Sequence, residues 1–577
     1  MSCLRHLKLA AILEEIADLL EIKGENPYKI RAYRRGAQAI ALLPADLQEV
    51  VLQGKLESVP GIGKALAAKV QEWLETGKIA YYEELAAEVP RGLLDVMRVP
   101  GIGPRLAKRL YDEIGVASLE DLARAVRERK LRTVRGLGPR TEMRIERELA
   151  LLEVDSKGVP LAEALALGRT LLEQVRAIPG VTRAELAGEV RRMKERADRV
   201  TIVAAADDGS PVREALWAIA GNEEGLEDQG NLISIAVGRE LKAELRVVPP
   251  ASFMLAWHAL TGSPRHLQEL GRWARERGFA LGEEGILELA TGRVHYPETE
   301  EELYQLLSLP YLPPELREGL GEVEMASAGR LPSLVTLEAI RGDLHVHSNW
   351  SDGRSSIREI ALAAKERGYE YIAITDHSQA LKIAGGLTRD DLLRQREEIA
   401  RVQEAVPGVK ILAGVEVDIL ADGSLDLDDE ILAELDLVVA SIHSGLRQDR
   451  EKLTQRLVRA ISHPHVDIIG HPTGRLLGER GAADIDIDRV IEAAAECQTA
   501  LEINASPQRL DLKDVLARRA AEAGVLLAVN TDAHETGQLA FMELGIGVAR
   551  RAWCTPAQIL NAKSWDELSL WLKERRS

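Results

Sequence analysis

Histidine and carboxylate side chains gather in one short stretch of this sequence. His345, His347 and Asp352 fall within eight residues. Leu344 and Val346 alternate with polar neighbours, which is the spacing of a β-strand and places both histidines on the same face. Imidazole and carboxylate groups are common metal ligands. The stretch therefore predicts a metal site at the end of a strand.

The same residue types follow other apolar runs in residues 341–577. Seven such runs alternate with helical segments, which predicts a (β/α) barrel. Six of the seven deliver a His, Asp or Glu where the run ends, and barrels of this type carry their active sites there. The sixth run, residues 500–504, offers no obvious ligand. The candidate ligands are His345, His347, Asp352, His377, Glu416, His443, His471, Asp532 and His534.

The number of candidate ligands indicates more than one ion. A single histidine at a strand end is usually structural. Nine His, Asp and Glu side chains at the ends of neighbouring strands make that interpretation of the whole set untenable. Mixed histidine and carboxylate ligands suit Zn²⁺, Mn²⁺ or Fe²⁺, and nine exceed the four that one ion takes, so we expect two or three divalent ions. His463 and His465 precede the fifth run and are interpreted as bystanders.

Six short motifs of residues 341–577 resemble those of the PHP (polymerase and histidinol phosphatase) domain. They are His-x-His, Thr-Asp-His, Gly-x-Glu, His-Ser, Gly-His-Pro and Thr-Asp-Ala-His. The resemblance implies a distorted (β/α)7 barrel with three metal ions that hydrolyses phosphoesters by means of a metal-bound hydroxide. It implies one ion at His345, His347, Glu416 and Asp532, a second at Glu416, His443 and His471, and a third at Asp352, His377 and His534. Arg475 is a candidate phosphate contact, and equally a candidate helix cap.

Residues 1–150 are expected to form helices joined by short glycine turns. The turns Val59–Lys64, Val99–Pro104 and Val134–Pro139 share a hydrophobic-Gly-hydrophobic-Gly core. Such glycines let a phosphate approach backbone N–H groups at a helix start, although one turn alone could equally be a helix C-cap. The three copies resemble the helix-hairpin-helix motif, which holds the DNA backbone without reading sequence. The candidate DNA-binding residues are Gly61, Gly63, Lys64, Gly101, Gly103, Arg105, Gly136 and Gly138.

Charge confines any DNA contact to part of the molecule. The net charge of the chain is −18, whereas residues 1–150 carry 25 Lys and Arg against 22 Asp and Glu. A chain this acidic should not bind DNA over its whole surface, so the N-terminal part is the candidate. The three cysteines form no motif, no apolar run reaches membrane length, and the acidic first helix is not a signal peptide. A cytoplasmic protein is expected.

The order of these parts resembles that of the bacterial and archaeal family X DNA polymerases with a C-terminal PHP domain. Further resemblance lies in Asn26–Tyr33, Leu245–Pro250 and Leu260–Ser263. The fold class implied is a multidomain α and α/β chain. Its expected parts are an N-terminal 8 kDa-like helical domain (1–80), a fingers-like helical domain (81–150), a small polymerase-beta-like α/β palm (151–255), a thumb (256–325), a linker (326–340) and the PHP barrel (341–577).

The palm departs from that family's pattern. The family has Gly-Ser-x-Arg-Arg, then Gly-Asp-x-Asp on a strand, then an Asp before Leu-Arg-Val. Aspartates at i and i+2 share a face of the strand and hold paired Mg²⁺ ions. Here the serine and the paired aspartates are replaced, so Mg²⁺ in the palm is not expected. The residues of this degenerate site are Glu189, Arg192, Arg199, Thr201 and Glu244, of which Arg192 and the carboxylate of Glu244 match the family.

The sequence therefore predicts a DNA-binding, metal-dependent phosphoesterase. It would act as a 3′–5′ exonuclease or process 3′ ends in DNA repair, on gapped or end-containing DNA of any sequence. One alternative is an active gap-filling DNA polymerase with exonuclease activity, in which other carboxylates replace the lost pair. A second is a small-molecule phosphatase of the histidinol-phosphatase type. A third is a non-catalytic DNA scaffold, which the intact ligand set disfavours.

Overall fold

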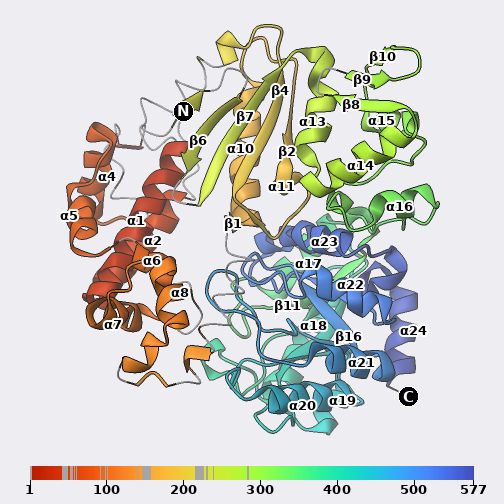
Figure 1. Cartoon of the computed structure of the whole chain (residues 1–577). Coiled ribbons are helices and arrows are strands. Elements are labelled where there is room, and N and C mark those ends of the chain that lie inside the picture. Colours follow the sequence, from red (N-terminus) through yellow and green to blue (C-terminus); the bar gives the residue numbers. More distant parts are fainter. Residues whose placement is uncertain are drawn as a thin grey trace.

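The computed structural model divides the chain into an N-terminal helical region, a central α/β region and a C-terminal barrel (Figure 1). No helix among the described residues is both long and apolar enough to cross a membrane. The described residues are 3–41, 50–51, 56, 59, 61–90, 92–97, 99, 102–134, 136–138, 141–143, 145, 158–212, 214, 226–228, 232–237, 240–282 and 285–576.

The N-terminal helices pack as one unit. Buried side chains between Leu9 and Ile145 form a single hydrophobic core, which includes Ile62 and Ile102 from the first two glycine turns. The turns are therefore fixed by side chains that point inward, while Gly61, Gly63 and Gly103 are exposed. The helices are α1 (Cys3–Lys23), α2 (Pro27–Ala41), α4 (Lys64–Thr76), α5 (Ala80–Glu88), α6 (Gly92–Met97), α7 (Pro104–Ile114) and α8 (Leu119–Arg127).

The central region contains a five-stranded sheet in the order β2-β4-β7-β6-β5. On β4, Val200 and Ile202 pack in the core that includes α10, whereas Val203 and Ala205 pack with Phe253 of α13, so both faces are covered. The bounds are α10 (Leu161–Arg176), β2 (Arg183–Ala187), α11 (Gly188–Arg191), β4 (Arg199–Ala205), β5 (Leu226–Asp228), β6 (Leu232–Val237), β7 (Leu241–Val248) and α13 (Phe253–Thr261).

A separate core forms the thumb. Its buried side chains include Leu270, Ile286 and Tyr304, and a buried ion pair joins Arg317 to Glu300. The remaining elements are α14 (Pro264–Glu276), β8 (Phe279–Gly282), β9 (Gly285–Glu288), β10 (Val294–His295), α15 (Glu300–Leu306) and α16 (Glu322–Ser327).

Seven parallel strands form the C-terminal barrel in sequential order, as the sequence predicted. A bridge joins Val346 of the first strand to Ala533, just after the last strand, so the sheet is nearly closed. The strands are β11 (Gly342–Val346), β12 (Tyr371–Ile374), β13 (Lys410–Asp418), β14 (Leu437–Ser441), β15 (Ile468–Ile469), β16 (Ala500–Asn504) and β17 (Leu527–Asn530). The helices are α17 (Ile357–Glu366), α18 (Arg389–Ala405), α19 (Asp429–Glu434), α20 (Arg450–Ile461), α21 (Ile487–Cys497), α22 (Asp514–Glu522), α23 (Met542–Arg551) and α24 (Trp565–Arg575).

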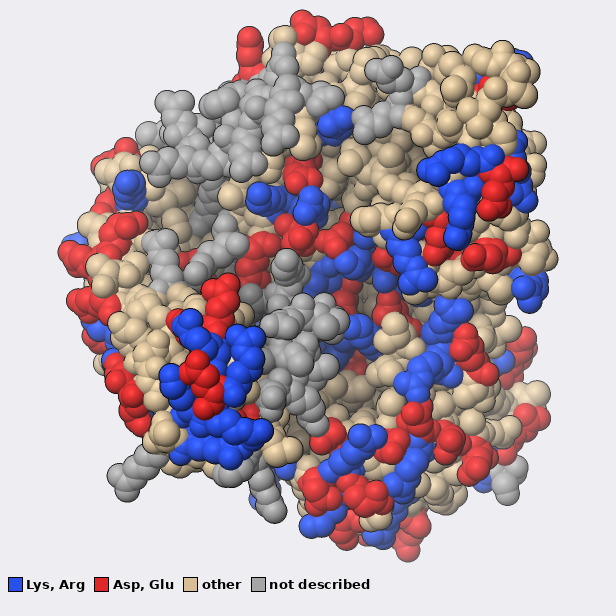
Figure 2. All heavy atoms as spheres, viewed as in Figure 1, with Lys and Arg blue, Asp and Glu red and all other residues tan. Residues whose placement is uncertain are grey.

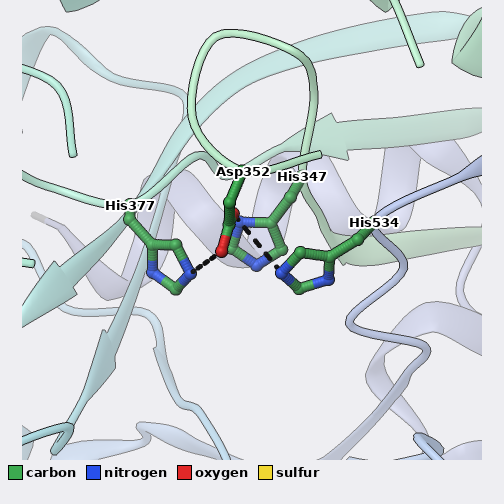
Figure 3. Close-up of side chains that lie close together, drawn as sticks. All are labelled: His347, Asp352, His377 and His534. Atoms are coloured by element: carbon green, nitrogen blue, oxygen red, sulfur yellow. Dashed lines mark ion pairs between the residues drawn. The ribbon is translucent and has the colours of Figure 1, made fainter. Parts of the chain in front are cut away.

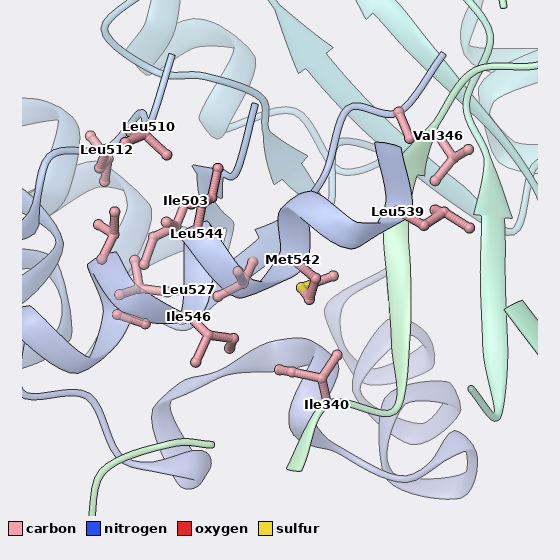
Figure 4. Close-up of a cluster of buried hydrophobic side chains, with 14 of the residues drawn as sticks. Ile340, Val346, Ile503, Leu510, Leu512, Leu527, Leu539, Met542, Leu544 and Ile546 are labelled. Carbon is pink, nitrogen blue, oxygen red and sulfur yellow. The ribbon is translucent and has the colours of Figure 1, made fainter. Parts of the chain in front are cut away.

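One end of the barrel is covered by a helix. Leu568 and Leu572 of α24 pack against Tyr371 and Leu437, the first residues of β12 and β14, so α24 covers the end where the strands begin. In Figure 4, α23 lies across the strands with Met542 among the buried side chains. The opposite, carboxyl ends of the strands are thereby left for the site.

The barrel contacts the palm and thumb through α23 and the loops beside it. Arg551 donates to the backbone oxygen of Arg192 at 3.0 Å and pairs with Glu318 at 2.8 Å. From the palm, Glu195 pairs with Arg475 of the barrel at 2.8 Å. These contacts are partly buried, so the barrel has a defined position against the polymerase-like frame.

Candidate functional site

The nine predicted ligands converge at the carboxyl ends of the barrel strands. Three overlapping groups offer ligand atoms close enough to surround an ion. Figure 3 shows that the side chains of one group point toward a common space from three separate segments. The groups are His345, His347 and Asp532; His377, Glu416 and His443; and His347, Asp352, His377 and His534.

Glu416, at the end of β13, lies at the centre of the whole set. Its carboxylate is 2.8 Å from His377 Nδ1, 3.0 Å from His471 Nε2 and 3.3 Å from His443 Nε2. The Nε2 atoms of His345 and His347 lie 3.5 and 3.6 Å from Oε2, the oxygen that also faces His377, whereas Oε1 faces His443 and His471. A carboxylate shared in this way can bridge two ions.

The grouping differs from that implied by the resemblance. His347 belongs to the group of Asp352 and His534 as well as to that of His345 and Asp532. His377 lies between two groups, because it is 2.8 Å from Glu416 and 3.6 Å from Asp352. The implied set placed it with Asp352 and His534 only. All nine side chains nevertheless occupy one continuous site.

Several buried polar atoms of the site have no hydrogen-bond partner within the described chain. They include Nε2 of His345 and Nε2 of His347, both on fully buried rings. His347 Nε2 lies 3.1 Å from a carboxylate oxygen of Asp532, and His345 Nε2 lies 3.7 Å from it. Buried polar atoms normally have partners, and these nitrogen and oxygen atoms form the donor set of a divalent transition metal. The residues therefore fit metal ions.

Electrostatics of the site favour bound cations. Burial raises the pKa of Glu416, but His443 and His345 outweigh it and hold that pKa well below its usual range. Burial lowers the pKa of His443, whereas Glu416 and Asp418 outweigh it and raise it to about 10. The ionised carboxylates are thus stabilised by positive charge nearby. Divalent ions held by neutral imidazoles would supply that charge.

Behind the candidate ligands, Glu502 on β16 supports two of them. Its carboxylate is 2.7 Å from His345 Nδ1 and accepts a hydrogen bond from the His471 backbone N–H at 2.6 Å. Asn504 donates to both Glu502 and Asp532, at 3.0 and 3.1 Å. Sequence reasoning found no ligand on this strand and missed its supporting role. The signal was present, because Glu502 and Asn504 alternate on a strand whose neighbours carry ligands.

Two arginines approach the site from loops. Arg475, the candidate phosphate contact, is 8% exposed and donates to Glu195 and to the backbone oxygen of Leu510, so it joins barrel and palm. Arg509 was not singled out from the sequence, yet its Nε lies 3.6 Å from Asp532. Arg509 therefore faces the ligand set, whereas one terminal nitrogen of Arg475 is engaged by Glu195 and Leu510.

The three glycine turns have a common geometry. The central hydrophobic residue donates its N–H to the preceding valine oxygen, at 3.0 Å for Ile62, 2.9 Å for Ile102 and 3.0 Å for Leu137. Gly61 has φ +100°, and a Cβ there would approach the Arg35 backbone oxygen to 3.2 Å, so glycine is required by the turn. Gly136 likewise has φ +83°. Gly101, at the matching position of the second turn, lies outside the described residues.

Helices α4 and α7 begin at glycines that leave their first amides uncapped. Gly63 and Gly103 are the N-cap residues, and neither offers a side-chain cap. Both are exposed, as are Lys64 and Arg105 beside them, whereas Gly138 is half-buried. Uncapped amides at a helix start form an anion site.

Basic side chains also gather near the third turn. Figure 2 shows Lys and Arg concentrated over the region where Figure 1 places α8. Arg124 and Arg127 lie in its last turn, and Lys130 and Arg132 follow in a short 3-10 helix. Asp121, Glu128 and Glu142 pair with some of these cations, which reduces the net positive charge.

In the palm, Arg199 lies beside two carboxylates. The register pairs Thr201 of β4 with Glu244 of β7. Arg199 contacts Asp198 at 2.9 Å and Glu244 at 3.3 Å, so its guanidinium bridges two carboxylates. Among the described residues, the groups of three or more His, Cys, Asp and Glu side chains that could hold an ion all lie in the barrel.

The other palm residues are engaged in internal contacts. Glu189 accepts a hydrogen bond from the Asp198 N–H at 3.0 Å and pairs with Lys194. Arg192 is 6% exposed and donates to the Thr261 backbone oxygen and to Glu318 of the thumb. These contacts hold the palm and thumb together.

Comparisons with known proteins match the parts in the same order. Residues 6–79 match the family model of the helix-hairpin-helix domain, and residues 93–150 that of the SAM-like helix-hairpin-helix tandem. Residues 256–318 match the DNA polymerase beta thumb, and residues 343–506 match the PHP domain. Fold, site and matches together define a chain that joins polymerase-beta-like parts to a PHP domain.

The chain belongs to the family X DNA polymerases that carry a C-terminal PHP domain. It is 38% identical over 564 residues to the DNA polymerase/3′-5′ exonuclease PolX of Bacillus subtilis (strain 168). The aligned region covers 97% of this chain and 98% of that protein. It is also 34% identical over 245 residues to a probable phosphatase of Thermoanaerobacter sp. (strain X514), which covers 41% of this chain and 95% of that protein.

The support that Glu502 gives to His345 and His471 leads to a measurable expectation. Glu502→Gln should lower the affinity for Zn²⁺ or Mn²⁺ by roughly 10- to 100-fold, the usual effect of losing a carboxylate behind a metal-binding histidine. Competition with a chelating dye measures this affinity. Asp467→Asn is the matched control, because Asp467 is equally buried but pairs with Arg576 near the start of β15. Equal affinities for wild type and Glu502→Gln would contradict the supporting role.

Proposed function

We propose that this protein is a DNA-binding, metal-dependent phosphoesterase that removes nucleotides from 3′ ends as a 3′–5′ exonuclease. The observation that carries the proposal is the site centred on Glu416, where nine ligand-type side chains meet at the carboxyl ends of the strands. This arrangement suits two or three ions of Zn²⁺, Mn²⁺ or Fe²⁺. Removal of a 3′-terminal phosphate by the same chemistry is the closest variant.

The chain's own residues would position the phosphodiester. When bound, divalent ions supply polarisation of the phosphoryl oxygens and activation of water. Glu502 and Asn504 fix the orientations of His345 and Asp532 behind the ligand set. Arg509, 3.6 Å from Asp532, would meet a non-bridging phosphate oxygen. Arg475 would act indirectly by holding the neighbouring loop to the palm.

DNA as the substrate is supported by the N-terminal region. The uncapped amides that follow Gly63 and Gly103 suit phosphates spaced along a backbone, and such contacts are independent of sequence. The phosphatase of Thermoanaerobacter aligns with 41% of this chain only. A small-molecule phosphatase would have no use for the helical region, so DNA with gaps or free ends is the preferred substrate.

In the palm, we propose that polymerase activity is absent or weak. Nucleotidyl transfer needs two divalent ions held by carboxylates. Arg199 places a permanent cation between Asp198 and Glu244, which opposes Mg²⁺ there. The second candidate function is gap-filling DNA synthesis, favoured by the name of the Bacillus subtilis relative and by the retained palm and thumb.

The metal centre can be tested with two pairs of histidines in the same barrel. His345→Ala combined with His347→Ala should reduce hydrolysis of a 3′-labelled gapped duplex by at least about a thousandfold, since two ligands and their buried donor atoms are lost. His463→Ala combined with His465→Ala is the control, because these histidines lie outside the three ligand groups. Hydrolysis is followed on denaturing gels with Mn²⁺. Undiminished activity in the first double variant would contradict the assignment of His345 and His347 as metal ligands.

The glycine turns can be tested without disturbing the fold. A Cβ at Gly63 or Gly103 meets nothing within 4 Å, and neither has positive φ. Gly63→Val with Gly103→Val should therefore weaken DNA binding about tenfold or more by blocking phosphate approach, and should flatten the salt dependence of the Kd.

Fluorescence anisotropy with two unrelated DNA sequences measures both effects. Ala80→Val is the matched control: Ala80 is exposed at the start of α5, but its N–H is occupied by Glu72 at 2.8 Å. If the glycine variant binds DNA with unchanged affinity, the turns connect helices and do not bind DNA.

Primer extension distinguishes the two candidate functions of the palm. On gapped DNA with Mg²⁺ or Mn²⁺, the variant that lacks His345 and His347 should show no robust template-directed synthesis, because the palm lacks its paired carboxylates. Using this variant prevents degradation from concealing synthesis. Arg199→Asp with Thr201→Asp in the same background restores the carboxylate pair on one face of β4 and should recover some extension. Strong extension by the unmodified palm would establish the polymerase instead.

A further inference from the structure

Ile383 is an apolar side chain in an unusual place. It is 97% exposed, the highest value among the large hydrophobic residues of the described chain. Single exposed hydrophobic residues are common and need no explanation by themselves. Ile383 differs because it lies on a segment that leaves the barrel directly at a candidate metal ligand, His377.

The segment that carries Ile383 is held firmly. Its first part is bound to Asp426, which accepts from Ser378 Oγ and the Ala380 N–H, each at 2.6 Å, and from Gln379 through its backbone oxygen at 2.8 Å. It returns to the barrel where the Leu387 N–H donates to the His377 oxygen at 2.7 Å. The exposure of Ile383 is therefore imposed by a braced turn.

The tip of this segment stands close to the metal centre. A Cβ at Gly385 would lie 3.8 Å from the backbone oxygen of Ser351, the residue before Asp352. Ile383 is two residues from Gly385, a stretch that spans at most about 7 Å of chain. Consecutive nucleotides of a stacked strand rise by about 3.4 Å. Ile383 is thus within reach of the nucleotides next to one whose phosphate occupies the site.

The burial of the site restricts how a DNA strand can enter. Glu416 is 1% exposed and His345 and His347 are fully buried, whereas Asp352 is exposed and His534 half-buried. A phosphodiester that reaches the buried ligands would have to leave the duplex. The bases of such a single strand lose their stacking partners. Proteins that hold unstacked bases pack aromatic or apolar side chains against the base faces and supply cations for the backbone.

We propose that Ile383, with the adjacent exposed Lys382, forms a single-strand subsite in which the isoleucine contacts the base next to the 3′-terminal nucleotide and the lysine meets a phosphate. This inference rests on the proposed exonuclease function. The apolar side chain replaces stacking lost on strand separation, and Lys382 adds a sequence-independent charge contact. The subsite selects unpaired 3′ ends of any sequence.

A double-mutant cycle between protein and DNA tests the contact. The substrates are a single-stranded oligonucleotide and the same strand with an abasic residue next to the 3′-terminal nucleotide. Ile383→Ser should raise KM for the normal strand about tenfold, the order expected for losing one buried isoleucine contact, with kcat unchanged. It should have no further effect on the abasic strand, because the partner group is already missing. Leu570→Ser is the control, since Leu570 is 56% exposed on α24 at the other end of the barrel.

Two outcomes separate the subsite from the proposed function. Hydrolysis of bis(4-nitrophenyl) phosphate should be equal in wild type and Ile383→Ser, because this small diester reaches the metal centre without the subsite. If wild type hydrolyses the small diester but not DNA, the proposed function fails, and the subsite fails with it. In the second outcome, wild type hydrolyses DNA while Ile383→Ser either keeps the wild-type KM or shows the same rise in KM on normal and abasic strands. Either result overturns the base contact and leaves the exonuclease function standing.

Discussion

The buried carboxylate of Glu416 is the constraint on which the barrel's site depends. An ionised carboxylate that is 1% exposed is strongly unfavourable unless positive charge surrounds it. Histidines from four other strand ends lie within 3.6 Å of it, and each must be oriented with its nitrogen inward. The carboxyl ends of the strands are thus drawn toward one point, and divalent ions are the natural compensation for the charge gathered there.

Orientation of that site extends well beyond the ligands. Glu502 on β16 fixes His345, and Asp418 on β13 fixes His443 at 3.0 Å. The loops after β15 and β16 are joined through Arg475 to Glu195 of the palm. The polymerase-like frame therefore contributes to the position of the loop that carries Arg509, even if it carries out no chemistry itself.

The fold of the palm does not depend on the polar side chains of its sheet. Its sheet keeps both faces covered and its register intact, because that packing depends on Val200, Ile202 and Val203 rather than on catalytic carboxylates. Arg199 now satisfies Asp198 and Glu244 with its own charge. Fold and function are separable in this way because stability comes from buried apolar area, whereas catalysis comes from a few polar side chains. The candidate functional groups of this chain lie in the barrel and at the glycine turns.

The sequence by itself determined the parts and most of the site. Apolar runs that alternate with helical segments predicted all seven barrel strands, and the residues after them placed the candidate ligands, since the strand ends of a parallel barrel must converge. Only the tertiary structure decided that His377 lies between two ligand groups, that Glu502 supports the site and that Arg509 rather than Arg475 faces it. These depend on ångström-scale distances between segments far apart in the chain. Local spacing fixes which face a side chain shares, but packing of the whole barrel fixes which groups meet.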